Sequence, residues 1–210
     1  MKTPTVVKIG GHTYNIRKWE ILNYLSGLSG SDGFMKIVIL GCGGHAGVLK
    51  GVLTRGISGK PEIIMIQPDS VPPPHHKTVI GIGDLGLRKR LFEKYPLSMR
   101  VISMDSTILT SIPSGDGVQV MAGAVIQVNV SIGDNTLINT GASIDHDSVI
   151  GRHCHIAPGV VICGGVTVGD GSFIGAGSII AEGVKIPENS FVPAGSLIGK
   201  NGYKNRYAKV

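Results

Sequence analysis

A six-residue repeat that runs without insertion through residues 118–201 constrains the fold more than any other feature. Three residues after each repeated apolar position stands Gly or Asn in twelve of the fourteen hexads. Neither a strand of period two nor a helix of period about 3.6 keeps this phase, so the self-similarity indicates a solenoid. Counted in steps of six, the apolar column is Val120, Ile126, Ile132, Ile138, Ile144, Ile150, Ile156, Ile162, Val168, Ile174, Ile180, Ile186, Val192 and Ile198.

The hexads predict a parallel β-helix in which three short strands make one triangular coil. The Ile/Val column points inward and stacks on itself about 4.8 Å apart, the usual spacing between strands. Gly and Asn supply the left-handed backbone conformation at each corner. Fourteen hexads correspond to roughly four and two-thirds coils. Small residues two places before the column fill the tapering corners, among them Ala142, Ser148, Cys154 and Ser172.

Two adjacent hexads break the corner rule, because they carry Asp147 and His153 where Gly or Asn is expected. Around them lie His146 and His155, so three of the seven histidines fall within ten residues of a scaffold that otherwise has none. Local rules tend to fail where function overrides them. This stretch is therefore the candidate catalytic region.

Length and composition limit the remaining possibilities. A chain of 210 residues can hold one or two domains, and its net charge of +6 suits anionic ligands such as nucleotides better than a nucleic-acid arm. Three cysteines without paired spacing favour a reducing compartment over a secreted disulfide framework. The sequence has no signal peptide, lipidation motif or long apolar span, so we expect a soluble cytoplasmic protein that binds neither membrane nor nucleic acid.

Ahead of the repeat, strand and helix patterns alternate, which predicts a small Rossmann-like parallel α/β domain. Its expected strands span 36–40, 62–66, 78–83 and 99–104, and its expected helices span 46–54 and 84–95. Residues 1–34 are interpreted as an extension with a hairpin over 6–16 and a helix over 17–28. The expected division is thus 1–34 extension, 35–110 α/β domain, 111–201 β-helix and 202–210 basic tail.

A glycine loop, residues 41–46, follows the first strand and opens the first helix of the α/β domain. Backbone amides at such a helix N-terminus favour phosphate. Gly41, Gly43 and Ala46 match the dinucleotide fingerprint, but Gln67 stands where an acidic ribose ligand is expected. A complete NAD site is therefore not expected.

The glycine loop Gly-x-Gly-Gly-His-Ala and the β-helix motif Asn-Thr-Gly-Ala-x-x-Asp-His-Asp, residues 139–147, occur here in that order. Together they resemble the sugar O-/N-acetyltransferases of the hexapeptide-repeat superfamily, over roughly residues 36–199. The nearest members act on nucleotide-linked 4-amino-4,6-dideoxy sugars of the GDP-perosamine or UDP-bacillosamine type, in polysaccharide biosynthesis. The resemblance implies a left-handed winding, acetyl-CoA as co-substrate, no metal, and a homotrimer with cofactor between neighbouring prisms.

The resemblance also assigns roles to residues. His146 matches the general base and Asp147 the carboxylate that orients it. Gly164, eighteen residues after His146, occupies the same corner one coil higher, so its amide is a candidate for the thioester. Contacts to acetyl-CoA fall on His155, Ala176 and Ala194, and contacts to the nucleotide-linked sugar fall on Gly43, Gly44, His45 and Gly83.

Two departures from the family pattern concern its ligands. Residues 67–69 are Gln-Pro-Asp where relatives carry acidic residues, which affects recognition of the base or ribose. Relatives also commonly finish with a Gly-x-Pro-Ala-Lys segment, which residues 199–210 lack. The grip on the tail of the cofactor is therefore expected to differ.

Several alternatives stay open at the level of sequence. Asp145 flanks the base on its other side and could be its partner, while His153 is expected to be exposed and Cys154 to be a core residue. Enzyme alternatives are O-acetylation of sialic acid or another hydroxyl acceptor, and a zinc lyase of the γ-carbonic-anhydrase type. The lyase needs histidines on separate coils, but Thr110 and Val128 stand below His146. A non-catalytic sugar-nucleotide scaffold is the alternative outside enzymes.

Overall fold

The computed structural model describes residues 6–9, 12–15, 35–57, 61–73, 76–95, 98–110, 115–199 and 202–205. Strand β1 (Val6–Ile9) pairs antiparallel with β2 (His12–Asn15), so the expected hairpin is confirmed. The expected helix over 17–28 lies outside the described residues. Within the described part, no helix combines the length and apolar character needed to cross a bilayer.

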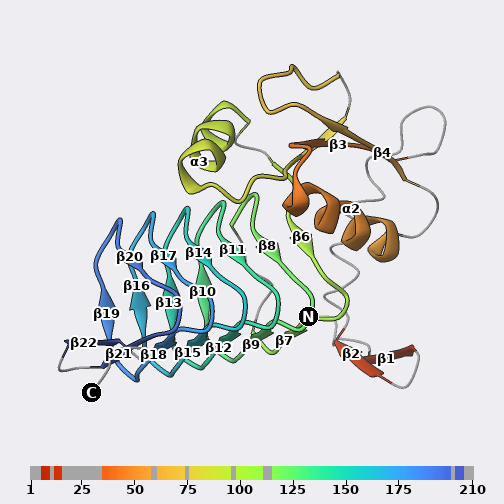
Figure 1. Ribbon diagram of the computed structural model, residues 1–210. Coiled ribbons are helices and arrows are strands. Elements are labelled where there is room, and N and C mark those ends of the chain that lie inside the picture. The colour runs from red at the N-terminus through yellow and green to blue at the C-terminus, as the bar shows by residue number, and fades with distance from the viewer. Residues whose placement is uncertain are drawn as a thin grey trace.

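Most of the described residues form a parallel β-solenoid of about five turns, built from three sheets (Figure 1). Sheet 1 contains β6 (Val101–Ile102), β8 (Gln119–Val120), β11 (Leu137–Ile138), β14 (His155–Ile156), β17 (Phe173–Ile174) and β20 (Phe191–Val192). Sheet 2 contains β7 (Thr107–Ile108), β9 (Val125–Ile126), β12 (Ser143–Ile144), β15 (Val161–Ile162), β18 (Ile179–Ile180), β21 (Ser196–Gly199) and the antiparallel β22 (Gly202–Asn205). Sheet 3 contains β10 (Ser131–Ile132), β13 (Val149–Ile150), β16 (Thr167–Val168) and β19 (Lys185–Ile186).

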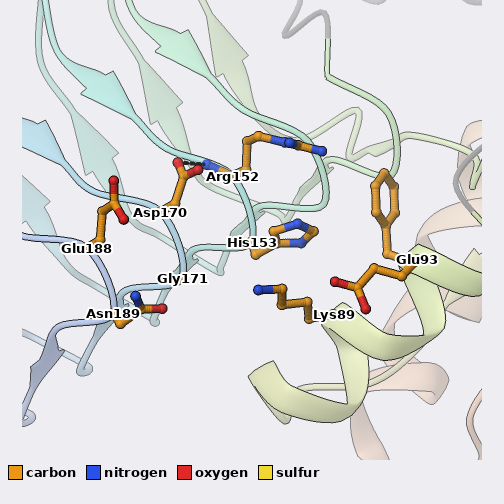
Figure 2. A pocket seen from close by; sticks show the side chains of 9 residues that line it. Lys89, Glu93, Arg152, His153, Asp170, Gly171, Glu188 and Asn189 are labelled. Carbon is orange, nitrogen blue, oxygen red and sulfur yellow. Dashed lines mark hydrogen bonds between the residues drawn. The ribbon is translucent and has the colours of Figure 1, made fainter.

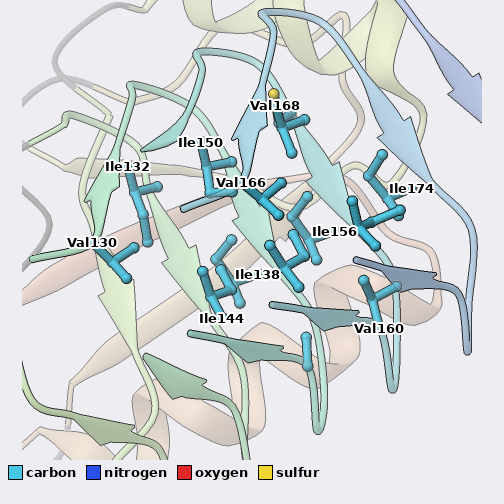
Figure 3. Packing of buried hydrophobic residues seen from close by; sticks show 14 of the residues in the cluster. Val130, Ile132, Ile138, Ile144, Ile150, Ile156, Val160, Val166, Val168 and Ile174 are labelled. Carbon is cyan, nitrogen blue, oxygen red and sulfur yellow. The ribbon is translucent and has the colours of Figure 1, made fainter. Parts of the chain in front are cut away.

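The apolar column forms the core of the solenoid, as predicted. Register pairs each column residue with the one eighteen places later, for example Ile138 with Ile156 and Ile144 with Ile162. All column residues from Val120 to Val192 are buried, and Ile198 is half-buried at the end. Figure 3 shows these side chains stacked inside the prism. Burial of this column is the main source of stability in the solenoid.

The corner rule is also confirmed. Every corner from Gly117 to Gly195 has a positive φ, and Asp147 (59°) and His153 (56°) adopt it as well as the Gly and Asn residues do. The small inward residues do more than fill space, because their hydroxyls bond the backbone of the next turn. Ser148 Oγ donates to the Cys163 carbonyl at 3.0 Å and accepts from Val166 N at 3.2 Å. Corner backbone groups that strands cannot pair are thereby satisfied.

Ahead of the solenoid lie β3 (Lys36–Leu40), α2 (Gly44–Gly56), β4 (Glu62–Ile66), β5 (Lys77–Ile80) and α3 (Leu85–Lys94), which we together call the α/β unit. Its three strands form a parallel sheet of order β4-β3-β5. Strand positions β3 and β4 agree with the predicted ones. Helix α3 begins after Asp84, whose side chain accepts from Leu87 N at 2.7 Å.

The prediction of a fourth strand in this unit, over residues 99–104, is wrong. Met99 N donates to the Thr78 carbonyl at 2.7 Å, but the next residues form β6, which pairs with β8 of the solenoid. Ile102 and Ile108 keep the six-residue phase of the apolar column and partly cover its core, so coiling starts before residue 111. Ser114 interrupts the apolar column between Ile108 and Val120, which is why the pattern alone assigned this strand to the α/β domain.

The α/β unit packs on sheet 1, and a buried arginine joins the two (Figure 1). Arg88 of α3 is 1% exposed and donates to the carbonyls of Ile80 (2.9 Å), Gly117 (2.9 Å) and Asn135 (3.1 Å). Burial lowers the pKa of its guanidinium to about 9. Three carbonyls from three segments converge on this side chain, so it fixes α3 against the solenoid.

We predict that two corner glycines differ in their tolerance of a side chain. Gly117 and Gly159 have nearly the same φ, 67° and 66°, but an added Cβ would meet the Phe92 ring at 2.8 Å in the first and nothing within 4 Å in the second. Gly159→Ala should cost only about 1–2 kcal/mol for the left-handed conformation. Gly117→Ala should cost about 1–3 kcal/mol more through overpacking. Urea denaturation measures both, and equal losses would contradict the close contact with α3.

Candidate active site

The predicted base lies at the corner between sheets 2 and 3, in the turn that joins β12 to β13. His146 Nδ1 is 2.8 Å from Asp147 Oδ2, while the other Asp147 oxygen accepts from Asn129 Nδ2 at 3.0 Å. Asp145 instead accepts from the backbone N–H of His146 at 2.8 Å. Of the two flanking carboxylates, Asp147 is therefore the one that contacts the imidazole. Because a carboxylate only accepts, Nδ1 carries a proton and Nε2 holds the lone pair in the neutral ring.

Charge around this corner favours the protonated imidazole. The hydrogen bond to Asp147 and then the charge of Asp145 raise the pKa of His146, and the same bond lowers the pKa of Asp147. Both side chains are more than half exposed, so solvent screens the pair. The arrangement provides an accessible imidazole, of one fixed tautomer, that can take up a proton near neutral pH.

Gly164 lies directly over the imidazole of His146, as expected from its place one coil higher. A Cβ there would come within 2.8 Å of His146 Cε1 and Nε2, so only glycine leaves the ring in place. Gly165 N donates to the His146 carbonyl at 2.9 Å, whereas the Gly164 N–H has no partner among the described residues. An open imidazole nitrogen and a free amide thus adjoin at one corner.

A second set of predicted residues gathers between the α/β unit and sheet 1. His155 of β14 has Nδ1 3.3 Å from the Gly83 carbonyl and Nε2 3.2 Å from Asn139 Nδ2, and its ring packs edge-on against Phe173. Burial is the main reason that its pKa falls to about 4. His155 is therefore neutral, with both nitrogens in use, and it ties the Gly83 segment to the solenoid.

The glycine loop has open space where ligand contact was predicted. A Cβ added at Gly43, Gly44 or Gly83 would meet no atom within 4 Å. Gly43 is the N-cap of α2 without a side-chain cap, and the first turn of that helix has no acidic residue. The amides at this N-terminus are thus available to an anion. Gly41 differs, because its φ is 132° and an added Cβ would collide with the Gly81 carbonyl, so glycine is required there by the backbone.

The two sets lie on different sides of the prism. His146, Asp147 and Gly164 occupy the edge between sheets 2 and 3, whereas His45, Gly83 and His155 lie over sheet 1, the face opposite that edge. Ala176 and Ala194 follow β17 and β20 and lie at the edge between sheets 1 and 2. One chain therefore does not bring the base and the glycine loop together.

A cavity of about 430 Å³ lies apart from both sets, between α3 and the edge shared by sheets 1 and 3. Figure 2 shows Lys89 and Glu93 of α3 facing Arg152, His153 and Asp170 across this cavity. The prediction that His153 is exposed is wrong. Its Nδ1 is 2.9 Å from Asn135 Nδ2 and its ring packs on Phe92, so the side chain is half-buried.

The positions of the three histidines and of Cys154 bear on the zinc-lyase alternative and on the expected role of the cysteine. His146, His153 and His155 lie at two edges and one face, and no three metal-ligating side chains cluster among the described residues. Cys154 is buried, and burial raises its thiol pKa to about 11, which confirms it as a core residue.

Sequence reasoning missed three residues that hold the set on sheet 1. Gln119 contacts His45, Asn139 contacts His155, and Arg88 supports the segment between them. Gln119 and His155 share one outward column of sheet 1 with Leu137, and the α/β unit covers part of that column. A glutamine among apolar outward positions was a signal, but its meaning depended on knowing what covers it.

Comparison with known proteins places the chain in a family. Residues 129–164 and 165–200 match the family described as bacterial transferase hexapeptide (six repeats). PerB from Caulobacter crescentus, solved with CoA and GDP-perosamine, is 30% identical, with a TM-score of 0.66 over 80% of this chain and 96% of that chain. The chain belongs to the sugar acetyltransferases with a left-handed β-helix.

Two further structures resemble this acetyltransferase. A variant of perosamine N-acetyltransferase from the same organism, also with CoA and GDP-perosamine, is 28% identical, with a TM-score of 0.68 over 80% of this chain and 95% of that chain. The acetyltransferase domain of PglB from Neisseria gonorrhoeae, with acetyl coenzyme A, shares the fold at 23% identity, with a TM-score of 0.69 over 82% of this chain and all of that one. No curated protein matches the chain significantly in sequence.

For this acetyltransferase we predict how the pKa of His146 responds to its neighbours. Asp147 makes the larger contribution, so Asp147→Asn should lower the pKa more than Asp145→Asn does. Because the native pKa is raised, the imidazole stays protonated to a higher pH, and losing the carboxylate should free the base at lower pH. NMR titration of the His146 ring measures both variants. A larger drop in Asp145→Asn would show that the wrong carboxylate has been assigned.

Proposed function

We propose that the chain transfers the acetyl group of acetyl-CoA to the amino group of a nucleotide-linked 4-amino-4,6-dideoxy sugar. The observation that carries the proposal is the His146 imidazole, held at Nδ1 by Asp147 and open at Nε2 beside Gly164. The amino-sugar acceptor is supported by PerB and by the variant of perosamine N-acetyltransferase, both of which were solved with CoA and GDP-perosamine. We propose a nucleotide-linked sugar of this class as the acceptor on the basis of that similarity.

The proposed reaction needs one proton acceptor and no covalent enzyme intermediate. The neutral amine attacks the thioester carbonyl, a C–N bond forms, and the proton that the nitrogen sheds goes to His146 Nε2. The C–S bond then breaks and CoA leaves as the thiol after protonation. Asp147 keeps the proton on Nδ1 and stabilises the imidazolium, and the Gly164 amide is suited to the developing oxyanion.

Binding is assigned to the remaining predicted residues. The α/β unit serves as the Rossmann-like nucleotide-sugar domain, with phosphate at the N-terminus of α2 beside Gly43, Gly44 and His45, and with Gly83 close by. Acetyl-CoA lies along the solenoid, in contact with His155, Gly164, Ala176 and Ala194. The open space at Gly43, Gly44 and Gly83 supports this assignment.

We also propose that the protein is a homotrimer with three shared sites. His146 lies on the edge opposite the face that holds His45 and Gly83, so substrate bound at the glycine loop cannot meet the base of the same chain. A neighbouring prism that presents its His146 edge to this face completes the site. The groove between the prisms then holds acetyl-CoA.

Thiol release from acetyl-CoA tests the function directly, with a panel of nucleotide-linked amino sugars and product masses. Acetylation of the amine supports the proposal. Turnover only with sialic acid or another hydroxyl acceptor would establish the O-acetyl alternative, and nucleotide-sugar binding without thiol release would establish a scaffold.

We predict that His146→Ala lowers kcat by roughly 10²–10⁴, the span expected for losing a general base. The matched control is His153→Ala, which changes a histidine of the next hexad at the opposite side of sheet 3. Steady-state kinetics at saturating substrates measure both. Near-full kcat in His146→Ala would contradict the assigned base.

The shared site predicts complementation between two defective subunits. Gly44→Val should raise the KM for the nucleotide-linked sugar strongly, because a side chain fits the free protein but blocks approach of the ligand to the backbone. Mixed with His146→Ala subunits, it should regain activity, since each mixed trimer has one interface that joins an intact loop to an intact base. Co-expression with two tags isolates the mixed species.

The homotrimers of each variant are the controls, and their activity sets the background. Mixed trimers as inactive as the controls would show that each chain holds a complete site. Sedimentation gives the state of assembly, and an active monomer would contradict the trimer.

A further inference from the structure

A chain of hydrogen bonds begins at the Ile80 carbonyl and ends at the imidazole of His45. Gln119 Nε2 lies 2.7 Å from the Ile80 carbonyl oxygen, and Gln119 Oε1 lies 2.9 Å from His45 Nε2. Gln119 is fully buried on sheet 1, beneath the α/β unit, whereas His45 stands in the first turn of α2. The candidate ligand loop is thus connected to the solenoid through one amide side chain.

Chemistry fixes the orientation of that amide. The Ile80 carbonyl can only accept, and it already accepts from Arg88 Nη1 at 2.9 Å. Rotating the Gln119 amide by half a turn would place two oxygens 2.7 Å apart without a proton between them. Gln119 Nε2 therefore donates to Ile80, and Oε1 faces His45 as an acceptor.

The tautomer of His45 follows from this orientation. Gln119 Oε1 accepts, so His45 Nε2 carries a proton and Nδ1 holds the lone pair of the neutral ring. The titratable and charged groups facing the ring are Arg88 and His155. Burial and the positive charge of Arg88 lower the pKa of His45, against the bond to Gln119 that raises it. The imidazole is neutral at physiological pH.

His45 Nδ1 has no partner among the described residues. It belongs to a loop whose Gly43 and Gly44 face open space. We propose that Gln119 is a positioning residue that presents His45 Nδ1 as a hydrogen-bond acceptor for an O–H or N–H group of the ligand. This deepens the proposed function and rests on it for the nature of the ligand. The phosphates, which are acceptors, are left to the backbone amides of α2.

The tautomer can be measured in the free protein, without substrate. Long-range ¹⁵N–¹H spectra of the histidine rings distinguish a protonated from an unprotonated nitrogen, and His45→Gln identifies the signals. We expect a protonated Nε2 and an unprotonated Nδ1. Gln119→Met should give exchanging tautomers. Leu137→Met, one coil along the same outward column, should leave the spectrum of His45 unchanged.

Binding of the ligand supplies the functional readout. Gln119→Met should lower the affinity for the nucleotide-linked sugar about threefold to tenfold, which is the effect of losing one neutral hydrogen bond, and kcat should be nearly unchanged. In Gln119→Glu, the carboxyl oxygen that faces the Ile80 carbonyl must carry a proton, and the neutral carboxyl then makes the same two bonds as Gln119. Affinity should therefore fall as the carboxyl ionises with rising pH, and a purely structural role of Gln119 predicts no such pH dependence.

Calorimetry with GDP and UDP, with and without an attached sugar, locates the donor group. Equal losses in Gln119→Met place the donor on the nucleoside, and a loss confined to the nucleotide-linked sugar places it on the sugar. A protonated Nδ1 in the free wild-type protein would overturn the proposal, as would unchanged affinity in Gln119→Met. If no nucleotide binds at all, the proposed function fails, while the spectra still decide the role of Gln119.

Discussion

The whole structure depends on a backbone constraint, namely that each hexad must turn a corner at a positive φ. Every described corner from Gly117 to Gly195 does so, and the strands between them contain only two residues in most coils. Because each coil then contains eighteen residues, positions separated by that number stack. The stacking places Gly164 over His146 and His155 beneath Phe173. Site geometry is therefore a consequence of the repeat.

The same scaffold gives its histidines opposite properties. His146 lies at an exposed corner between two carboxylates, which raise its pKa and leave Nε2 open. His45 lies within the α/β unit and His155 lies beneath it, both near Arg88, and burial lowers their pKa values. An accessible imidazole with a raised pKa suits proton transfer, whereas neutral buried imidazoles suit hydrogen bonding with a fixed direction. Environment, rather than residue type, separates the roles.

Arg88 organises the interface from which these differences arise. A buried cation bonded to three carbonyls holds α3, the end of β5 and the solenoid in one arrangement. The Ile80 carbonyl oxygen, which accepts from Arg88, also accepts a second hydrogen bond from Gln119. The α/β unit is thus attached rigidly to the face opposite the His146 edge. If the glycine loop and His146 act on one substrate, the His146 edge must therefore come from a neighbouring chain.

The sequence by itself determined the solenoid, since a column of Ile and Val with a corner residue three places later has one periodic solution. It also singled out Asp147 and His146 as candidates, because a broken corner is visible without coordinates. It could not choose between Asp145 and Asp147, assign the strand at Val101–Ile102 to a sheet, or see that His153 is half-buried against Phe92. Tertiary structure decided these points, and it alone revealed the contacts of Gln119, Asn139 and Arg88. Their roles depend on contacts between segments tens of residues apart, and the energies of such contacts leave no local periodicity in the chain.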